Sequence, residues 1–253
     1  MSTAVLETRA LSKSFGALRV ADDIDFRLEQ GARHALIGPN GAGKTTFINL
    51  VTGRVLPGAG TVSLEGRDIT RLSQNRRVKL GVVRTFQINT LFLGLSVLDN
   101  VALALAERDG IAWSLFRPVG HYRRLVEEGR HLLQTLGLEQ HAAKLVRELS
   151  YGRQRLVEIA LGLALRPRVL LLDEPAAGVP SGESAIVIDM LQRLPRDISI
   201  LMIEHDMDLV FRFAHRITVL NQGRILAEGA PAEIAANEQV RAVYFGERDV
   251  THA

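Results

Sequence analysis

Residues 38 to 46 read GPNGAGKTT, and this stretch, the phosphate loop, determines the fold class more firmly than any other part of the chain. Its glycines let the backbone bend around an anion, so that successive amide N–H groups and the positive end of the next helix point at phosphate. Residues 33–37 (RHALI) are predicted to form a buried strand, and residues 47–53 (FINLVTG) a helix. A strand before the loop and a helix after it are the context that phosphate binding requires.

The pattern G-x-x-x-x-G-K-[ST] also predicts a role for single residues. Lys44 is expected to reach the β and γ phosphates of a nucleoside triphosphate, and the hydroxyl of Thr45 is expected to bind Mg²⁺. The predicted nucleotide-binding residues of the loop are Gly38, Pro39, Asn40, Gly41, Ala42, Gly43, Lys44, Thr45 and Thr46.

A second apolar strand ends in two adjacent carboxylates. It lies in residues 169–175, which read VLLLDEP. Asp173 is placed to hold Mg²⁺ through its water shell, and Glu174 to accept a proton from an attacking water molecule. Acidic pairs at strand ends are common, but a phosphate loop upstream makes this one a predicted Walker B motif with a catalytic glutamate.

The segment between these motifs carries a resemblance to a known family. Residues 149–165, the signature stretch, read LSYGRQRLVEIALGLAL and resemble the signature motif of ATP-binding cassette (ABC) ATPases. The resemblance covers nearly the whole chain and implies ATP and Mg²⁺ as ligands. It implies that two subunits enclose ATP between them, with Ser150 and the Gly152 amide of one subunit on the γ phosphate held by the other. Glu174 would then activate water in each site.

Three further site residues follow from the same resemblance. Phe15 in SKSFGAL is expected to stack on adenine, although a phenylalanine here also suits a core position. Gln87 in VVRTFQ is expected to contact Mg²⁺ or the attacking water. His205 in ILMIEHDMDL follows an apolar strand, where parallel sheets place ligand-contacting groups, and is expected to contact the γ phosphate. A lone histidine is otherwise more often a surface or packed residue.

The fold class expected is α/β, a P-loop NTPase of the ABC cassette type with a mixed core sheet, an antiparallel β subdomain and an inserted helical subdomain. One ABC ATPase domain is expected over residues 1–253. Residues 1–87 and 166–253 would form the RecA-like core with the antiparallel β subdomain, and residues 88–165 the helical subdomain. The elements predicted from periodicity are strands at 4–11, 23–30, 81–86, 168–172 and 198–203, hairpins at 61–69 and 216–229, helices at 96–108, 121–138, 183–194 and 206–213, and two short helices within 231–249.

Composition excludes several classes of protein. The chain has 253 residues, of which 47% are hydrophobic and 23% charged, and this is typical of a globular domain. It has no cysteine, so disulfides are excluded, and no run approaching a membrane span or a signal peptide is found. The formal charge is +3 and the basic residues are scattered, which argues against nucleic acid as a partner. Neither cysteine ligands nor an H-E-x-x-H motif occurs, so a protein-bound zinc is not expected.

Several short sequence segments indicate which branch of the ABC family the chain resembles. GVVRTFQ, LFLGLSVLDNVALAL, LSYGRQRLVEIA, LLDEPAAGV, IEHDMDLV and RAVYFGE resemble the ATPase of high-affinity branched-chain amino acid importers. The partners implied are integral-membrane permease subunits, a second ATPase subunit (self or paralogue) and, indirectly, a solute-binding protein. The protein would lie peripherally on the cytoplasmic face of the inner or plasma membrane. The alternatives are a cassette for urea, amides or lipopolysaccharide export, a soluble ABC ATPase, and a nucleotide switch without turnover.

The permease subunits are expected to dock near residues 88–105. Apolar Leu91, Phe92, Leu93 and Leu95 suit a docking groove, but core packing explains them equally well. The same ambiguity applies to Trp113 and Phe116 in IAWSLFRP.

Two residues depart from the family pattern. Arg153 stands where the signature motif usually has glutamine or glutamate, and Pro180 where many cassettes have an aspartate. Proline removes a backbone donor, so communication between the two ATP sites is expected to differ here.

Overall fold

The computed structural model describes residues 4–85, 91–111 and 123–245, except for the side chains of Ser181 and Phe245. The strands are β1 (Ala4–Phe15), β2 (Leu18–Glu29), β3 (Arg33–Ile37), β4 (Ala59–Leu64), β5 (Arg67–Asp68), β6 (Val82–Arg84), β7 (Val169–Asp173), β8 (Ser199–Ile203), β9 (Arg216–Asn221) and β10 (Arg224–Gly229). The α-helices are α1 (Lys44–Thr52), α2 (Gln74–Lys79), α3 (Val97–Arg108), α4 (Arg123–Thr135), α5 (Tyr151–Ala164), α6 (Ser181–Arg193), α7 (Met207–Phe213), α8 (Pro231–Ala236) and α9 (Glu238–Phe245).

The strands form two sheets. A six-stranded sheet has the order β10-β9-β3-β8-β7-β6, in which neighbours from β9 to β6 are parallel and β10 is antiparallel to β9. A four-stranded antiparallel sheet has the order β2-β1-β4-β5. Together with the helices, these sheets confirm the predicted fold class, a mixed core sheet with a separate antiparallel sheet.

The core strands are buried on both faces, which explains their unbroken apolar sequences. Alternate residues of β3 point into two different hydrophobic clusters: Ala35 and Ile37 join one, and Leu36 the other. The cluster around Leu36 also contains residues of α1 and of the antiparallel sheet, so α1 packs between the two sheets. The cluster around Ala35 contains residues of α3, α4, α5, α6 and α7.

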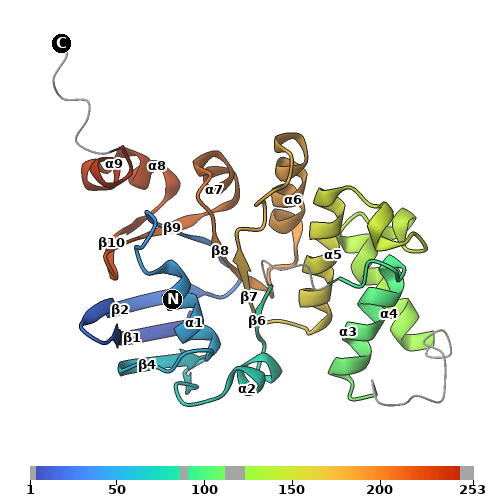
Figure 1. Ribbon diagram of the computed structural model, residues 1–253, viewed down its shortest axis with the longest axis horizontal. Coiled ribbons are helices and arrows are strands. Elements are labelled where there is room, and N and C mark those ends of the chain that lie inside the picture. The colour runs from blue at the N-terminus through green and yellow to red at the C-terminus, as the bar shows by residue number, and fades with distance from the viewer. Residues whose placement is uncertain (1–3, 86–90, 112–122, 246–253) are drawn as a thin grey trace, which may run out of the picture.

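Helices replace strands between β6 and β7. In this part of the chain the described elements are α3, α4, α5 and two short 3₁₀ turns, Glu139–His141 and Val146–Glu148. Figure 1 shows α3 and α4 at one end of the molecule and the antiparallel sheet at the other. The predicted helices at 96–108 and 121–138 are confirmed as α3 and α4.

Two features differ from the sequence prediction. Helix α2 was not expected, because its segment QNRRVK is polar and basic with no apolar periodicity. Strands β1 and β2 are longer than the predicted 4–11 and 23–30, because cross-strand pairing continues to Phe15 and Leu18 at the hairpin turn.

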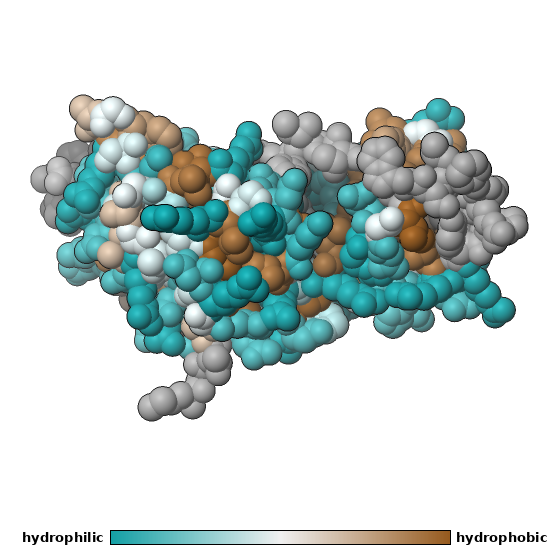
Figure 2. Space-filling model, turned by 90° about the horizontal axis from the view of Figure 1, so that it is seen from below, coloured by the Kyte–Doolittle hydropathy of each residue, from teal (hydrophilic) through white to brown (hydrophobic). Residues whose placement is uncertain are grey.

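The surface is largely hydrophilic on the face drawn in Figure 2, where hydrophobic residues gather near the middle and toward the end that carries α3 and α4. Among the described residues, no helix combines the length and apolar character needed to cross a membrane.

Candidate functional site

The ends of three neighbouring parallel strands bring the predicted motifs together. In the sheet register, Leu36 of β3 pairs with Ile203 of β8, and Ile203 pairs with Asp173 of β7. The phosphate loop follows β3, Glu174 directly follows β7, and His205 is the second residue after β8. The carboxyl ends of adjacent parallel strands form one edge of a sheet, which is where ligands bind in open α/β sheets.

The phosphate loop depends on glycine at Gly43. This residue has a φ of 104°, in the left-handed region that side chains disfavour. A Cβ there would lie 2.6 Å from the carbonyl oxygen of Val20 in β2, a contact that atoms do not make. Gly43 therefore lets the loop pack directly against the first hairpin and still turn into α1.

Lys44 points back into the phosphate loop. Its Nζ donates to the carbonyl oxygens of Gly38 at 2.5 Å and Pro39 at 2.9 Å. Burial lowers the pKa of Lys44, and the carboxylates of Glu174 and Asp173 act in the opposite direction. The ammonium group and both predicted acidic residues therefore lie near enough to interact. A phosphate group would compete with these carbonyl oxygens for the same charge.

Asp173 is held in place by Arg84, which was not predicted from the sequence to be a site residue. Arg84 of β6 forms an ion pair with the Asp173 carboxylate, and its other terminal nitrogen donates to Asn49 Oδ1 of α1 at 2.8 Å. Both charged side chains are largely buried. The Asp173 carboxylate and the hydroxyl of Thr45, an exposed residue at the start of α1, offer oxygen ligands, the type that Mg²⁺ prefers.

Glu174 and His205 face each other across the edge of the sheet. Glu174 Oε1 lies 4.0 Å from His205 Nδ1, and the histidine side chain is 70% exposed. Glu174 has a φ of 48°, an uncommon value for a residue with a side chain. Such backbone strain is often found at functional sites.

A buried carboxylate behind this pair fixes the backbone on both sides of it. Glu204 accepts hydrogen bonds from the Ala176 N–H at 3.0 Å and the His205 N–H at 3.1 Å. Burial raises the pKa of Glu204, and the two backbone donors partly oppose that effect. Glu204 thus connects the turn after β7 with the turn after β8. The only signal in the sequence was an acidic residue at the end of an apolar strand.

Arg155 connects the signature stretch to the turn after β7, which contains Glu174. Its guanidinium, buried in α5, donates to the carbonyl oxygens of Pro175 at 3.0 Å and Glu174 at 2.9 Å. It also pairs with Glu158 at 2.5 Å, one turn further along the helix. Helix α5 is therefore hydrogen-bonded directly to the backbone of Glu174. A charged residue within the apolar run QRLVEIA was the signal that could have indicated this role.

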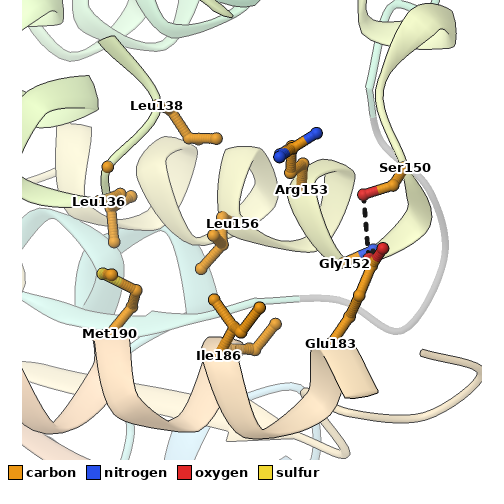
Figure 3. Close-up of a pocket in the computed structure, with 11 residues that line it drawn as sticks. Leu136, Leu138, Ser150, Gly152, Arg153, Leu156, Glu183, Ile186 and Met190 are labelled. Carbon is orange, nitrogen blue, oxygen red and sulfur yellow. Dashed lines mark hydrogen bonds between the residues drawn. The ribbon is translucent and has the colours of Figure 1, made fainter. Parts of the chain in front are cut away.

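Ser150 and Gly152 lie at the start of α5, in a separate pocket. Figure 3 shows the side chain of Glu183, from the first turn of α6, directed at both residues. Its Oε2 accepts a hydrogen bond of 2.9 Å from Ser150 Oγ and another of 2.9 Å from the Gly152 N–H. Arg153 lines the same pocket. No residue of the phosphate loop does, so the phosphate loop and the signature stretch of one chain do not share this pocket.

The remaining predicted residues have different settings. Phe15 is 52% exposed at the tip of the first hairpin and is not part of the core. Lys13 Nζ lies 5.4 Å from the centre of its ring. Gln87 lies outside the described residues. Pro180 precedes α6, and its carbonyl oxygen accepts from the Glu183 N–H at 2.8 Å.

Comparison with known proteins agrees with this geometry. The family model for ABC transporters matches residues 21–177, and the model described as "Branched-chain amino acid ATP-binding cassette transporter" matches residues 224–250. The chain is 36% identical to the high-affinity branched-chain amino acid transport ATP-binding protein BraF of Pseudomonas aeruginosa, over 98% of this chain and 100% of that protein. The protein LivG of Escherichia coli, which has the same description, is also 36% identical, with the same coverage.

Solved structures lead to the same family. A nucleotide-free ATP-binding cassette from an ABC transporter has a TM-score of 0.83 and 29% identity, covering 96% of this chain and 100% of that one. The ADP conformation of the ABC transporter cassette MJ1267 also has a TM-score of 0.83 and 29% identity, covering 96% of this chain and 99% of that one. The chain therefore belongs to the ABC transporter family, as one of its ATP-binding cassettes.

Proposed function

We propose that this chain is the ATP-hydrolysing subunit of an ABC importer that takes up branched-chain or related amino acids through membrane permease subunits. The observation that carries the proposal is the meeting of the phosphate loop, the Asp173–Glu174 pair and His205 at one edge of the core sheet. ATPase activity is general to the family, and the structure describes every residue of these three motifs.

Lys44 and the amides of the phosphate loop would hold the β and γ phosphates of ATP. The Lys44 ammonium would exchange its present carbonyl partners for phosphate oxygens, a stronger interaction because both partners are charged. Thr45 and Asp173 would hold Mg²⁺, with Arg84 keeping the Asp173 carboxylate in place. When bound, Mg²⁺ neutralises charge that builds up on the phosphates.

Glu174 would accept the proton of the attacking water, and His205 would contact the γ phosphate. Their separation of 4.0 Å leaves the histidine free to rotate toward a ligand, since its side chain is exposed. Glu204 holds the backbone of both turns, so the backbone positions of Glu174 and His205 are already fixed before the reaction. Gln87 is proposed to contact Mg²⁺ or the water, and Phe15 to stack on adenine.

The site is incomplete in one subunit. Ser150 and Gly152 would bind the γ phosphate held by a second subunit, so two cassettes would enclose two ATP molecules. Arg155 provides a route by which docking of the signature stretch would reach the Glu174 backbone. We propose that residues 88–165 act as the helical subdomain that moves in this cycle.

Permease subunits are proposed to dock just after Gln87, against the segment that leads into α3. The side chains of Phe92, Leu93 and Leu95 are 60%, 44% and 37% exposed. Leu91 belongs to the core at 7% exposed, so core packing is the correct explanation for that residue alone. Trp113 and Phe116 lie outside the described residues. This docking would place the protein peripherally on the cytoplasmic face of the membrane.

The proposed substrate class is based on the descriptions of the similar proteins. Both BraF and LivG are described as high-affinity branched-chain amino acid transport proteins, and the C-terminal family model has the same scope. A solute-binding protein would deliver the amino acid outside the membrane. Urea or amide uptake is the second candidate within the same architecture.

The test is ATP hydrolysis by this chain assembled with its permease subunits in lipid vesicles. Loaded solute-binding protein should raise the rate of hydrolysis, and leucine, isoleucine or valine should be imported while urea is not. A Phe92→Asp variant should lose the stimulation but keep its own ATP binding, because the Phe92 side chain is exposed and its backbone is hydrogen-bonded to Asn100 of α3 and not to the phosphate loop. Full turnover without permeases, unchanged by adding them, would contradict the transport assignment.

A further inference from the structure

The start of α5 already holds a negatively charged group. One carboxylate oxygen of Glu183 accepts from Ser150 Oγ and from the Gly152 N–H, both at 2.9 Å (Figure 3). The approach depends on Gly152, because a Cβ at that position would lie 2.4 Å from the same oxygen. Gly152 is buried and Ser150 half-buried, so the contact is partly shielded from water.

This carboxylate takes the place of a helix cap. Ser150 is the N-cap residue of α5, but its side chain makes no capping hydrogen bond, and the first turn of α5 contains no acidic residue. The positive end of a helix stabilises a nearby anion, and Glu183 of α6 supplies one. The carboxylate therefore stabilises the signature stretch when no phosphate is there.

A phosphate oxygen and this carboxylate need the same two hydrogens. A backbone N–H carries one hydrogen, and so does a serine hydroxyl. Two negatively charged groups at that point would also repel each other. The Glu183 carboxylate and a γ phosphate thus exclude each other from Ser150 and Gly152.

We propose that Glu183 is a further functional residue of the ATP site: its carboxylate occupies the γ-phosphate position of the signature stretch in the separated subunit and leaves it when the ATP of the second subunit docks. The proposal rests on the roles proposed above for Ser150 and Gly152. Arg153, which lines the same pocket, offers a cation to the displaced carboxylate.

The consequence is that closure of the dimer is opposed by an internal competitor. Each subunit must break two hydrogen bonds to a charged group before its signature stretch can bind phosphate, and a symmetric dimer must do so twice. Removal of the competitor should therefore tighten ATP-dependent dimerisation, whereas a residue that merely supports the loop would weaken dimerisation when removed.

The test compares variants in a Glu174→Gln background, which blocks hydrolysis, by sedimentation equilibrium with MgATP. Glu183→Ala should lower the dimer dissociation constant by about tenfold or more, the scale expected for lost hydrogen bonds to a charged group. Glu183→Gln keeps the shape and an acceptor oxygen but loses the charge, and should give a smaller change in the same direction. Glu127→Ala, which removes an exposed carboxylate of α4, is the control for net charge and should change nothing.

Three results distinguish a failure of the role proposed for Glu183 from a failure of the proposed function. Ser150→Ala in the same background should weaken the dimer if the signature stretch binds phosphate. If the parent forms a dimer but both Glu183 variants dimerise equally or more weakly, the role of Glu183 is wrong while the proposed function stands. If MgATP produces no dimer of any variant, the enclosed-ATP arrangement of two copies is overturned, and the inference with it.

Discussion

Acid should destabilise this protein through His34, a buried histidine at the centre of the core sheet. Its Nε2 lies 2.8 Å from Thr218 Oγ1, and the Thr218 hydroxyl donates to Glu228 at 2.9 Å. The hydroxyl hydrogen of Thr218 is therefore used in the bond to Glu228. His34 Nε2 must then carry a hydrogen and donate it to Thr218 Oγ1. Burial lowers the pKa of His34 to about 4, an effect that the Glu228 and Glu29 carboxylates oppose and Arg216 reinforces.

The sign and size of the effect follow from this shift. The pKa of His34 falls from 6.5 in the unfolded chain to about 4 in the folded protein, so the unfolded state binds the proton between these values. Stability is therefore complete above pH 6.5 and decreases as the pH falls. The loss is about 2 kcal/mol between pH 7 and pH 5, and about 3 kcal/mol once the pH reaches the folded pKa.

Urea unfolding at a series of pH values measures this. His34→Gln keeps a side-chain N–H donor but cannot take up a proton in this range, so its stability should fall less steeply below pH 6.5 than that of the native protein. The difference between the two curves removes the contributions of other titrating groups. Parallel curves would refute the assignment, and an NMR titration that placed the pKa of His34 near 6.5 would do the same.

Substitutions in the phosphate loop and at the edge of the sheet should separate into distinct effects. Gly43→Ala should lose ATP binding, because its Cβ would meet the Val20 carbonyl oxygen. Gly41 also has a positive φ, of 80°, but no atom lies within 4 Å of its Cβ position, so Gly41→Ala should bind ATP more tightly than Gly43→Ala. Equal isotherms would contradict the packing argument. Lys44→Ala should abolish nucleotide binding, while His205→Ala should keep it and lose hydrolysis. Calorimetry showing both variants equally unable to bind ATP would make the proposed role of His205 wrong.

The sequence predicted those parts of the molecule that depend on local pattern. The strand before the phosphate loop, the helix after it and the strand ending at Asp173 all appear where expected, because both faces of the core strands are buried and the loop chemistry is short-range. His205 was expected at a strand end where ligand-contacting groups lie, and the structure places it beside Glu174 at that edge.

Contacts between a charged side chain and a distant backbone could not be predicted in this way. Arg77 is completely buried, and one of its nitrogens donates to the carbonyl oxygens of Leu50 and Val51 at 2.7 Å, where α1 ends. Its segment reads as polar and exposed. Backbone carbonyls have no sequence signature, so the guanidinium partners of Arg77 and Arg155 remained hidden until the fold was known.

We propose that Glu174 performs the chemistry at a site that other residues hold together. The direct measurement is MgATP binding and steady-state turnover of Glu174→Gln beside the native protein. Glu174 is the proposed base and does not hold the nucleotide, so affinity should be near normal while turnover falls by about 10²-fold or more, the range expected for loss of a general base. Native turnover in this variant would contradict the account.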